Sequence, residues 1–97
     1  MTRRAAKVDA NQSAIVAAFR KAGASVQPLH MVGQGCPDLL VGFRGRNLAV
    51  EVKDGSKPPS ARKLTADEAE WHEAWRGQVC VVNDEDEALG LLLAYSQ

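Results

Sequence analysis

Two short apolar segments on either side of a run of turn-forming residues constrain the fold of this chain most strongly. Residues 38–43 (DLLVGF) and 48–53 (LAVEVK) have the length and composition of β-strands, and residues 44–47 (RGRN) are typical of a tight connection. In the second segment, apolar residues on one face alternate with Glu51 and Lys53 on the other. The pattern predicts an antiparallel hairpin with one apolar face.

The segments around the hairpin predict an α/β fold. Periodicity and turn residues indicate helices over residues 9–22, 65–76 and 88–95, and further strands over residues 25–30 and 78–82. Capping residues are expected at three helix starts: Asp9 with Gln12, Thr65 with Glu68, and Asp84 with Glu87. The order α-β-β-β-α-β-α predicts a mixed sheet with helices packed on its faces. Residues 78–82 are all but uniformly apolar, which predicts a fully buried strand.

Length and composition indicate one domain over residues 8–97, preceded by a basic arm over residues 1–7. No apolar run is long enough for a transmembrane span, and the N-terminus does not resemble a signal peptide. Cys36 and Cys80 stand alone, without metal-ligand spacing. We therefore expect a reduced cytoplasmic protein with no membrane association and no small-molecule cofactor.

The formal net charge of zero conceals a strong asymmetry along the chain. Residues 1–63 contain eleven basic and four acidic residues, a charge of +7, whereas residues 64–97 contain one basic and eight acidic residues, a charge of −7. The basic part is expected to face a polyanion and the acidic part to point away from it. Chance clustering of charges on surface helices is the alternative.

One group of residues has the composition of a hydrolytic site. Asp38 begins one strand of the hairpin and Lys53 ends the other, so antiparallel pairing places Asp38 beside Glu51 and Lys53. Two converging carboxylates suit Mg²⁺ or Mn²⁺, and a nearby lysine can orient a water molecule. This set is sufficient for metal-assisted phosphodiester hydrolysis. The alternative is an ordinary surface ion pair between Glu51 and Lys53.

The same residues resemble a known family. Residues 35–38 (GCPD) followed by residues 51–53 (EVK) are similar to the PD-(D/E)XK nuclease superfamily, whose fold is restriction-endonuclease-like. Three phrases narrow the resemblance to the stand-alone VRR-NUC family: GCPDLLVG at 35–42, EVKDG at 51–55 and LTADE at 64–68. The resemblance extends roughly from Val8 to Leu92. It implies a Holliday-junction-resolvase-like fold and a homodimer that cleaves branched DNA, in a bacterial or phage-infected cell.

The resemblance also implies roles for particular residues. Asp38 and Glu51 would be metal ligands for Mg²⁺ or Mn²⁺, the main-chain carbonyl of Val52 would complete the metal shell, and Lys53 would be the catalytic lysine. Many members carry a further glutamate in the first helix, which this chain lacks. Gln12 is the best-placed substitute because it lies on the inward-facing stripe of that helix.

Five other residues have two interpretations each. Asp9 is one turn before Gln12, but a helix cap explains it better than a site role. Glu68 lies where some related nucleases carry a site glutamine, and its capping box is an adequate explanation. His30 is interpreted as a strand-end histidine rather than a general base. For Trp71 and its neighbour Trp75, core or dimer packing is favoured over base stacking.

The basic residues are interpreted as contacts to the DNA backbone, independent of base sequence. They are Arg3, Arg4, Lys7, Arg44, Arg46, Lys57, Arg62 and Lys63. The leading hypothesis is thus a structure-selective, metal-dependent DNA endonuclease. A non-catalytic nucleic-acid-binding module with the same fold is the second hypothesis, and the missing helix-one glutamate supports it. A small interaction protein whose acidic half binds a basic partner is the third.

Overall fold

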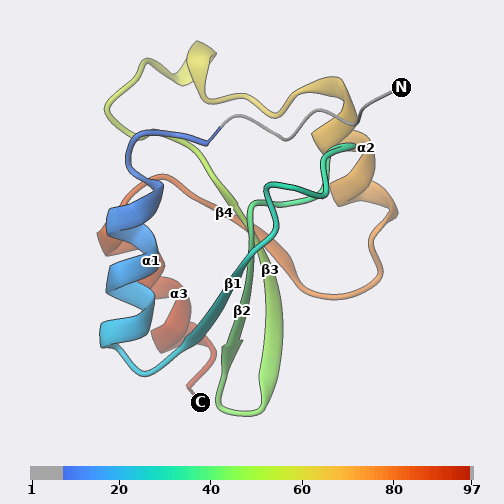
Figure 1. Cartoon of the computed structure of the whole chain (residues 1–97). Coiled ribbons are helices and arrows are strands. Elements are labelled where there is room, and N and C mark those ends of the chain that lie inside the picture. The colour runs from blue at the N-terminus through green and yellow to red at the C-terminus, as the bar shows by residue number, and fades with distance from the viewer. Residues whose placement is uncertain (1–7, 97) are drawn as a thin grey trace.

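A four-stranded mixed sheet forms the centre of the protein in a computed structural model that describes residues 8–96 (Figure 1). The elements are α1 (Gln12–Lys21), β1 (Ser25–Pro28), β2 (Leu39–Phe43), β3 (Arg46–Val52), a 3₁₀ turn (Pro59–Ala61), α2 (Ala66–Ala74), β4 (Val79–Val82) and α3 (Glu85–Ala94). Apart from that short turn, this is the predicted order of helices and strands. The expected basic arm, residues 1–7, lies outside the described residues.

The strands follow one another across the sheet in the order β1-β2-β3-β4. The first three are antiparallel, and β4 runs parallel to β3 after the connection through α2. Helices α1 and α3 pack together on one side of the sheet, and α2 lies on the other side, near the end of β3 (Figure 1). No helix between residues 8 and 96 has the length and hydropathy needed to cross a membrane.

The core lies between the sheet and the α1/α3 layer. Ile15 and Phe19 of α1 and Val50 of β3 are completely buried there. The same cluster contains Ala24, Leu39, Val41, Leu48, Val52, Val82, Ala88 and Leu92. Each large apolar side chain in such a position stabilises the fold by about 1.5–3 kcal/mol before entropy costs. The alternation in residues 48–53 therefore identified the core face of β3 correctly.

The hairpin turn is shorter than the four residues that composition predicted. Phe43 already pairs with Arg46, which leaves only Arg44 and Gly45 in the turn. Both have positive φ angles, 51° and 78° respectively. Two consecutive left-handed residues form a turn whose twist matches that of the flanking strands, so the ladder can continue to the last possible pair.

The helix starts confirm two of the three predicted caps. Thr65 and Glu68 form a reciprocal capping box, and Asp84 accepts a hydrogen bond from the backbone N–H of Glu87. Because Asp84 is the cap, α3 begins at Glu85 rather than at residue 88.

The third predicted cap, at Asp9, is wrong. Helix α1 starts at Gln12, and its N-cap Asn11 makes no side-chain cap. Instead, the Asn11 amide donates to the carbonyls of Lys53 (3.1 Å) and Asn83 (3.0 Å). The start of α1 is thus attached to the sheet at the ends of β3 and β4.

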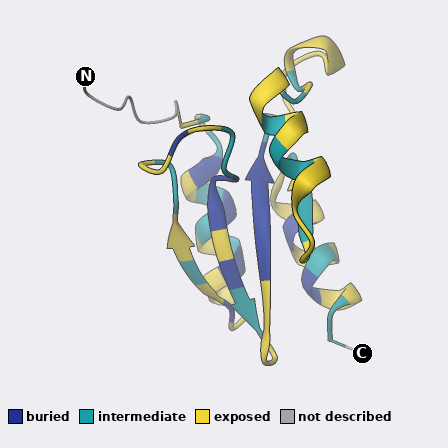
Figure 2. Cartoon of the chain, turned by 90° about the vertical axis from the view of Figure 1, so that its right-hand side faces the viewer, coloured by how far each residue is buried: buried dark blue, intermediate teal, exposed yellow. Residues whose placement is uncertain are grey.

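Two expectations of burial are also wrong. Strand β4 is an edge strand, not a fully buried one, and Val81 is 38% exposed on its outer face. Helix α2 contains no buried residue (Figure 2). Trp71 and Trp75 stack on each other with ring centroids 4.5 Å apart, and Trp75 is 50% exposed. The tryptophans therefore do not belong to the core, and dimer packing, the other half of that interpretation, stays a prediction.

Candidate active site

Asp38 and Glu51 form a buried carboxylate pair at the end of the hairpin farthest from the turn. Leu39 pairs with Val50, so the antiparallel register brings the preceding Asp38 next to Glu51, as predicted. Asp38 is 6% exposed and Glu51 is 2% exposed. Asp38 Oδ2 accepts a hydrogen bond of 2.7 Å from the backbone N–H of Val52, which fixes its side chain to β3.

Burial of two adjacent carboxylates makes their ionisation unfavourable. Burial is the main reason why the pKa of Asp38 is raised, and a hydrogen bond from the Val52 N–H only partly offsets it. Burial, followed by the hydrogen bond and charge of Asp38, raises the pKa of Glu51 to about 10. The pair therefore holds a proton at neutral pH unless positive charge is brought to it.

Lys53 supplies one positive charge and is held by an acid from α2. Its Nζ lies 2.7 Å from Glu68 Oε1 and 4.0 Å from Glu51 Oε2. Burial acts to lower the pKa of Lys53, but the hydrogen bond from its ammonium to Glu68 and the nearby acids outweigh it, so the pKa is raised. Lys53 is therefore protonated at neutral pH beside Glu68.

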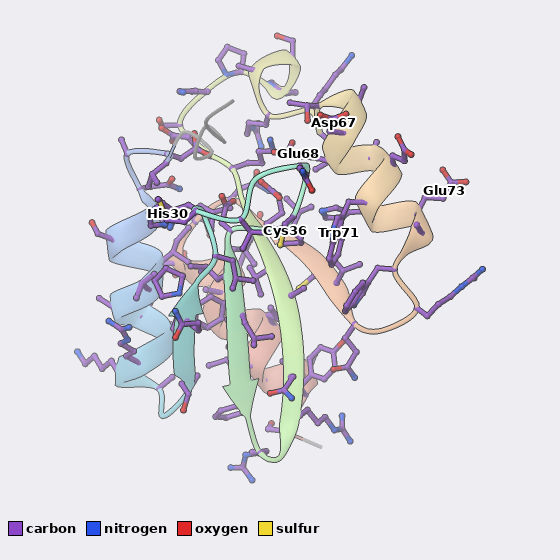
Figure 3. The ribbon with its side chains drawn as sticks, turned by 45° about the vertical axis from the view of Figure 1, so that its right-hand side comes forward. His30, Cys36, Asp67, Glu68, Trp71 and Glu73 are labelled. Carbon is purple, nitrogen blue, oxygen red and sulfur yellow. The ribbon has the colours of Figure 1, made fainter. Side chains whose placement is uncertain are left out.

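Glu68 has both of the roles that the sequence had presented as alternatives. Its Oε1 accepts from the Thr65 backbone N–H at 2.9 Å, which completes the capping box, and from Lys53 at 2.7 Å. The first turn of α2 is thus connected directly to the lysine of β3. In Figure 3, Glu68 lies at the start of α2, on the side of the helix near the sheet.

These side chains open into a cleft of about 360 Å³. Its lining is Asp9, Gly33, Gln34, Gly35, Cys36, Asp38, Glu51, Lys53, Thr65, Asp67 and Glu68. Five of these residues are acidic and Lys53 is the single basic one. Asp67 and Glu68 belong to the acidic C-terminal part of the chain, which was expected to point away from DNA, yet both line the cleft. Both residues belong to the first turn of α2, which borders the cleft.

A left-handed loop forms one wall of the cleft. Gly33, Gln34 and Gly35 have φ angles of 71°, 59° and 79°. A Cβ atom on Gly35 would lie 2.3 Å from the main-chain oxygen of Asp67, so only glycine permits this contact between the loop and α2. Cys36 follows in the same wall, and its thiol has a pKa raised by burial and by the charges of Glu51 and Asp38.

Of the further site candidates Gln12, Asp9 and His30, only Asp9 lines the cleft. Gln12 is buried, and its Oε1 has no hydrogen-bond partner within the described range, but Gln12 does not line the cleft. Asp9 does line the cleft, 4.0 Å from Lys57 Nζ, and is free of the helix-cap role. His30 lies in the loop after β1 with an unpartnered buried Nδ1, and it is outside the cleft lining.

The basic residues predicted to contact DNA form two groups within the described part of the chain. Lys57, Arg62 and Lys63 lie in the loop that leaves β3, and Lys57 Nζ is 4.0 Å from Asp9 of the cleft lining. Arg44 and Arg46 lie at the hairpin turn, a strand length of about 17 Å away. There they stack over aromatic rings, Arg44 over Phe43 and Arg46 over Tyr95. Arg3, Arg4 and Lys7 lie outside residues 8–96.

One residue near the pair was missed by the sequence analysis. His72 of α2 places its Nε2 3.9 Å from Glu51 Oε1. Burial lowers the pKa of His72. The signal that was available is its spacing of four residues from Glu68, which puts both side chains on one face of the helix.

The donor set fits a hard divalent cation that shares its coordination with other ligands. Between residues 8 and 96, no group of three or more His, Cys, Asp or Glu side chains is placed to hold a metal. Asp38 and Glu51 nevertheless supply two buried carboxylates, and Glu51 Oε1 has no hydrogen-bond partner in this part of the chain. Mg²⁺ typically binds through one or two carboxylates, with water and substrate phosphate completing its octahedron.

Fold and site together define an α/β domain of the nuclease-like type, with a mixed sheet and acidic residues at the strand ends. A solved structure described as a "VRR_NUC domain" matches this chain with a TM-score of 0.65 and 31% sequence identity, over 87% of this chain and 91% of that chain. No protein-family model matches the sequence, and no curated protein matches it. The structural match shows that the chain belongs to the VRR-NUC family, as its motifs indicated.

Proposed function

We propose that this protein is a metal-dependent endonuclease that hydrolyses phosphodiester bonds in branched DNA. The observation that carries the proposal is the buried Asp38/Glu51 pair with Lys53 beside it in an acidic cleft. Membership of the VRR-NUC family supports nuclease chemistry for the same residues.

The acidic cleft requires added positive charge before it can accept a phosphodiester. Five acidic residues against one lysine would repel DNA. Burial, with a smaller contribution from neighbouring acids, also keeps the pKa values of Asp38 and Glu51 raised. Asp38, Glu51 and the main-chain carbonyl of Val52 are the proposed ligands for Mg²⁺ or Mn²⁺. A bound divalent cation offsets charge on the phosphate and lowers the pKa of a coordinated water molecule.

Lys53 and Glu68 have distinct proposed roles. The Lys53 ammonium donates hydrogen bonds to a phosphate oxygen or to the attacking water and stabilises the charge that develops in the transition state. Glu68 fixes the ammonium from the opposite side through the 2.7 Å contact.

The loop after β3 is the proposed contact to the DNA backbone near the scissile bond. Lys57, Arg62 and Lys63 lie there, and their contacts to phosphate would be independent of base sequence and weakened by salt. Arg44 and Arg46 would reach a separate part of the DNA, as a branched substrate with diverging arms allows.

A homodimer is the proposed assembly, because cutting two strands at a branch requires two sites. The outer face of the sheet offers an apolar surface for it, since the register places Leu40 and Val81 on the same face as Ala49. Leu40 and Val81 are exposed there. Light scattering at micromolar concentration tests the assembly, and a monomer mass would contradict it.

The catalytic proposal is tested with a four-way DNA junction and a linear duplex of matched sequence, in Mg²⁺, Mn²⁺ or EDTA. We expect cleavage of the junction by the wild type and by Lys21→Ala, an exposed control on α1, and none by Lys53→Ala. If the wild type binds the DNA but does not cleave it in either metal, the protein is a non-catalytic binding module. Equal cleavage by Lys53→Ala would overturn the assigned site, and equal cleavage of the linear duplex would overturn the preference for branches.

A further inference from the structure

Two buried polar atoms that have no hydrogen-bond partner among residues 8–96 face each other where β3 meets α2. They are Glu51 Oε1 and His72 Nε2, 3.9 Å apart. Both side chains are largely shielded from solvent, so neither atom has bulk water available as a substitute. Because an unpaired buried polar atom is costly, two such atoms in mutual reach call for a common explanation.

The two oxygens of Glu51 are directed toward different elements. Oε2 lies 4.0 Å from Lys53 Nζ on the same strand, and Oε1 lies 3.9 Å from His72 Nε2 on α2. The two oxygens are equivalent, so rotation of the carboxylate about its last bond changes only the plane in which they lie. A donor on each side therefore fixes that plane relative to the cleft.

Helix α2 has the features expected of an element that serves the site rather than the core. It contains no buried residue, yet Glu68 and His72, one turn apart on one face, reach Lys53 and Glu51 respectively. Trp71, beside His72, also lies between the helix and the sheet, whereas Glu73 points to solvent (Figure 3).

We infer that His72 is a positioning residue for Glu51: its Nε2–H donates to Glu51 Oε1 and holds the other oxygen toward the cation. A side-chain movement of about 1 Å closes the 3.9 Å gap to a direct hydrogen bond, or one water molecule bridges it. Hydrogen bonds to a ligating carboxylate commonly change metal affinity by about 10–100-fold. The inference rests on the proposed function, since it takes Glu51 as a cation ligand.

The inference is tested by calorimetric titration of the whole protein with Mn²⁺ in the absence of DNA. Three variants are compared: His72→Phe, which removes the donor; His72→Gln, whose amide restores one; and Glu73→Gln, a solvent-facing control on the same helix. We expect His72→Phe to weaken Mn²⁺ binding by about tenfold or more, His72→Gln to stay within about threefold of the wild type, and Glu73→Gln to leave it unchanged.

The outcomes separate this inference from the function it depends on. If the wild type does not bind Mn²⁺, the proposed metal-dependent function fails, and the role of His72 fails with it. If the wild type binds Mn²⁺ and His72→Phe binds equally well, only the role of His72 is overturned. If His72→Phe lowers thermal stability, His72→Gln decides: a folded His72→Gln protein with the same weak binding as His72→Phe overturns the donor role.

Discussion

Replacing Glu51 with glutamine should stabilise the protein while destroying its proposed cation site. Burial beside Asp38 raises the pKa of Glu51 from its ordinary value of 4.5 to about 10. Because the pKa is higher in the folded state, folding takes up a proton between these two values. The contribution of this proton uptake to the free energy of unfolding is fully present below about pH 4.5 and is lost as the pH rises toward 10. A glutamine carries no such proton linkage.

The size of the effect follows from the pH interval. Each pH unit between the two pKa values costs the wild type at most about 1.4 kcal/mol, so the three units from pH 5 to pH 8 cost up to about 4 kcal/mol. We expect Glu51→Gln to exceed the wild type by about 2–4 kcal/mol at pH 8, which raises Tm by about 10–25 °C in a domain of this size. At pH 5 the advantage shrinks to about 1 kcal/mol or less.

Thermal unfolding followed by circular dichroism at pH 5 and pH 8, in EDTA, measures both differences. Glu73→Gln, an exposed glutamate on α2, serves as the matched control and should not shift Tm in a pH-dependent way. The reasoning is refuted if Glu51→Gln is no more stable than the wild type at pH 8, or if its advantage is equal at the two pH values.

Three further substitutions test the fold around the site. Phe19→Ala empties a fully buried position and should lower the free energy of unfolding by about 3–5 kcal/mol in urea titrations. Gly35→Ala meets both a positive φ and the Asp67 main-chain oxygen, so it should cost about 2 kcal/mol or more and speed amide exchange in α2; unchanged exchange would contradict that contact. Arg44→Asn suits the left-handed turn better and should raise stability by about 0.5–1 kcal/mol, seen as a higher Tm, whereas a lower Tm would contradict the turn assignment.

The hairpin and its carboxylates could be predicted from sequence because they depend on local rules. Alternation fixes the faces of β3, and a tight turn fixes its pairing with β2, so the position of Asp38 beside Glu51 follows. The same reasoning made the turn two residues too long, because composition alone does not show whether Arg46 belongs to the turn or to the strand.

The contribution of α2 could be predicted only for Glu68, because no apolar stripe marks the face of the helix that meets the sheet, and the contact of His72 with Glu51 was missed. Its contacts are made by Glu68 and His72, two polar residues that resemble an ordinary solvated surface in sequence. The burial of β4 was overestimated for a related reason. An apolar run indicates a strand, but its place at the edge of the sheet depends on the crossover from β3.

Because α2 contains no buried residue, core packing and the support of the site depend on different elements of this small domain. Core packing resides in α1, α3 and the sheet, while α2 reaches the site through surface side chains. Amides of α2 should therefore exchange through local opening, and those of β3 only through global unfolding. Substitutions in this helix can therefore change the contacts between the site and its substrate without lowering the free energy of unfolding of the domain.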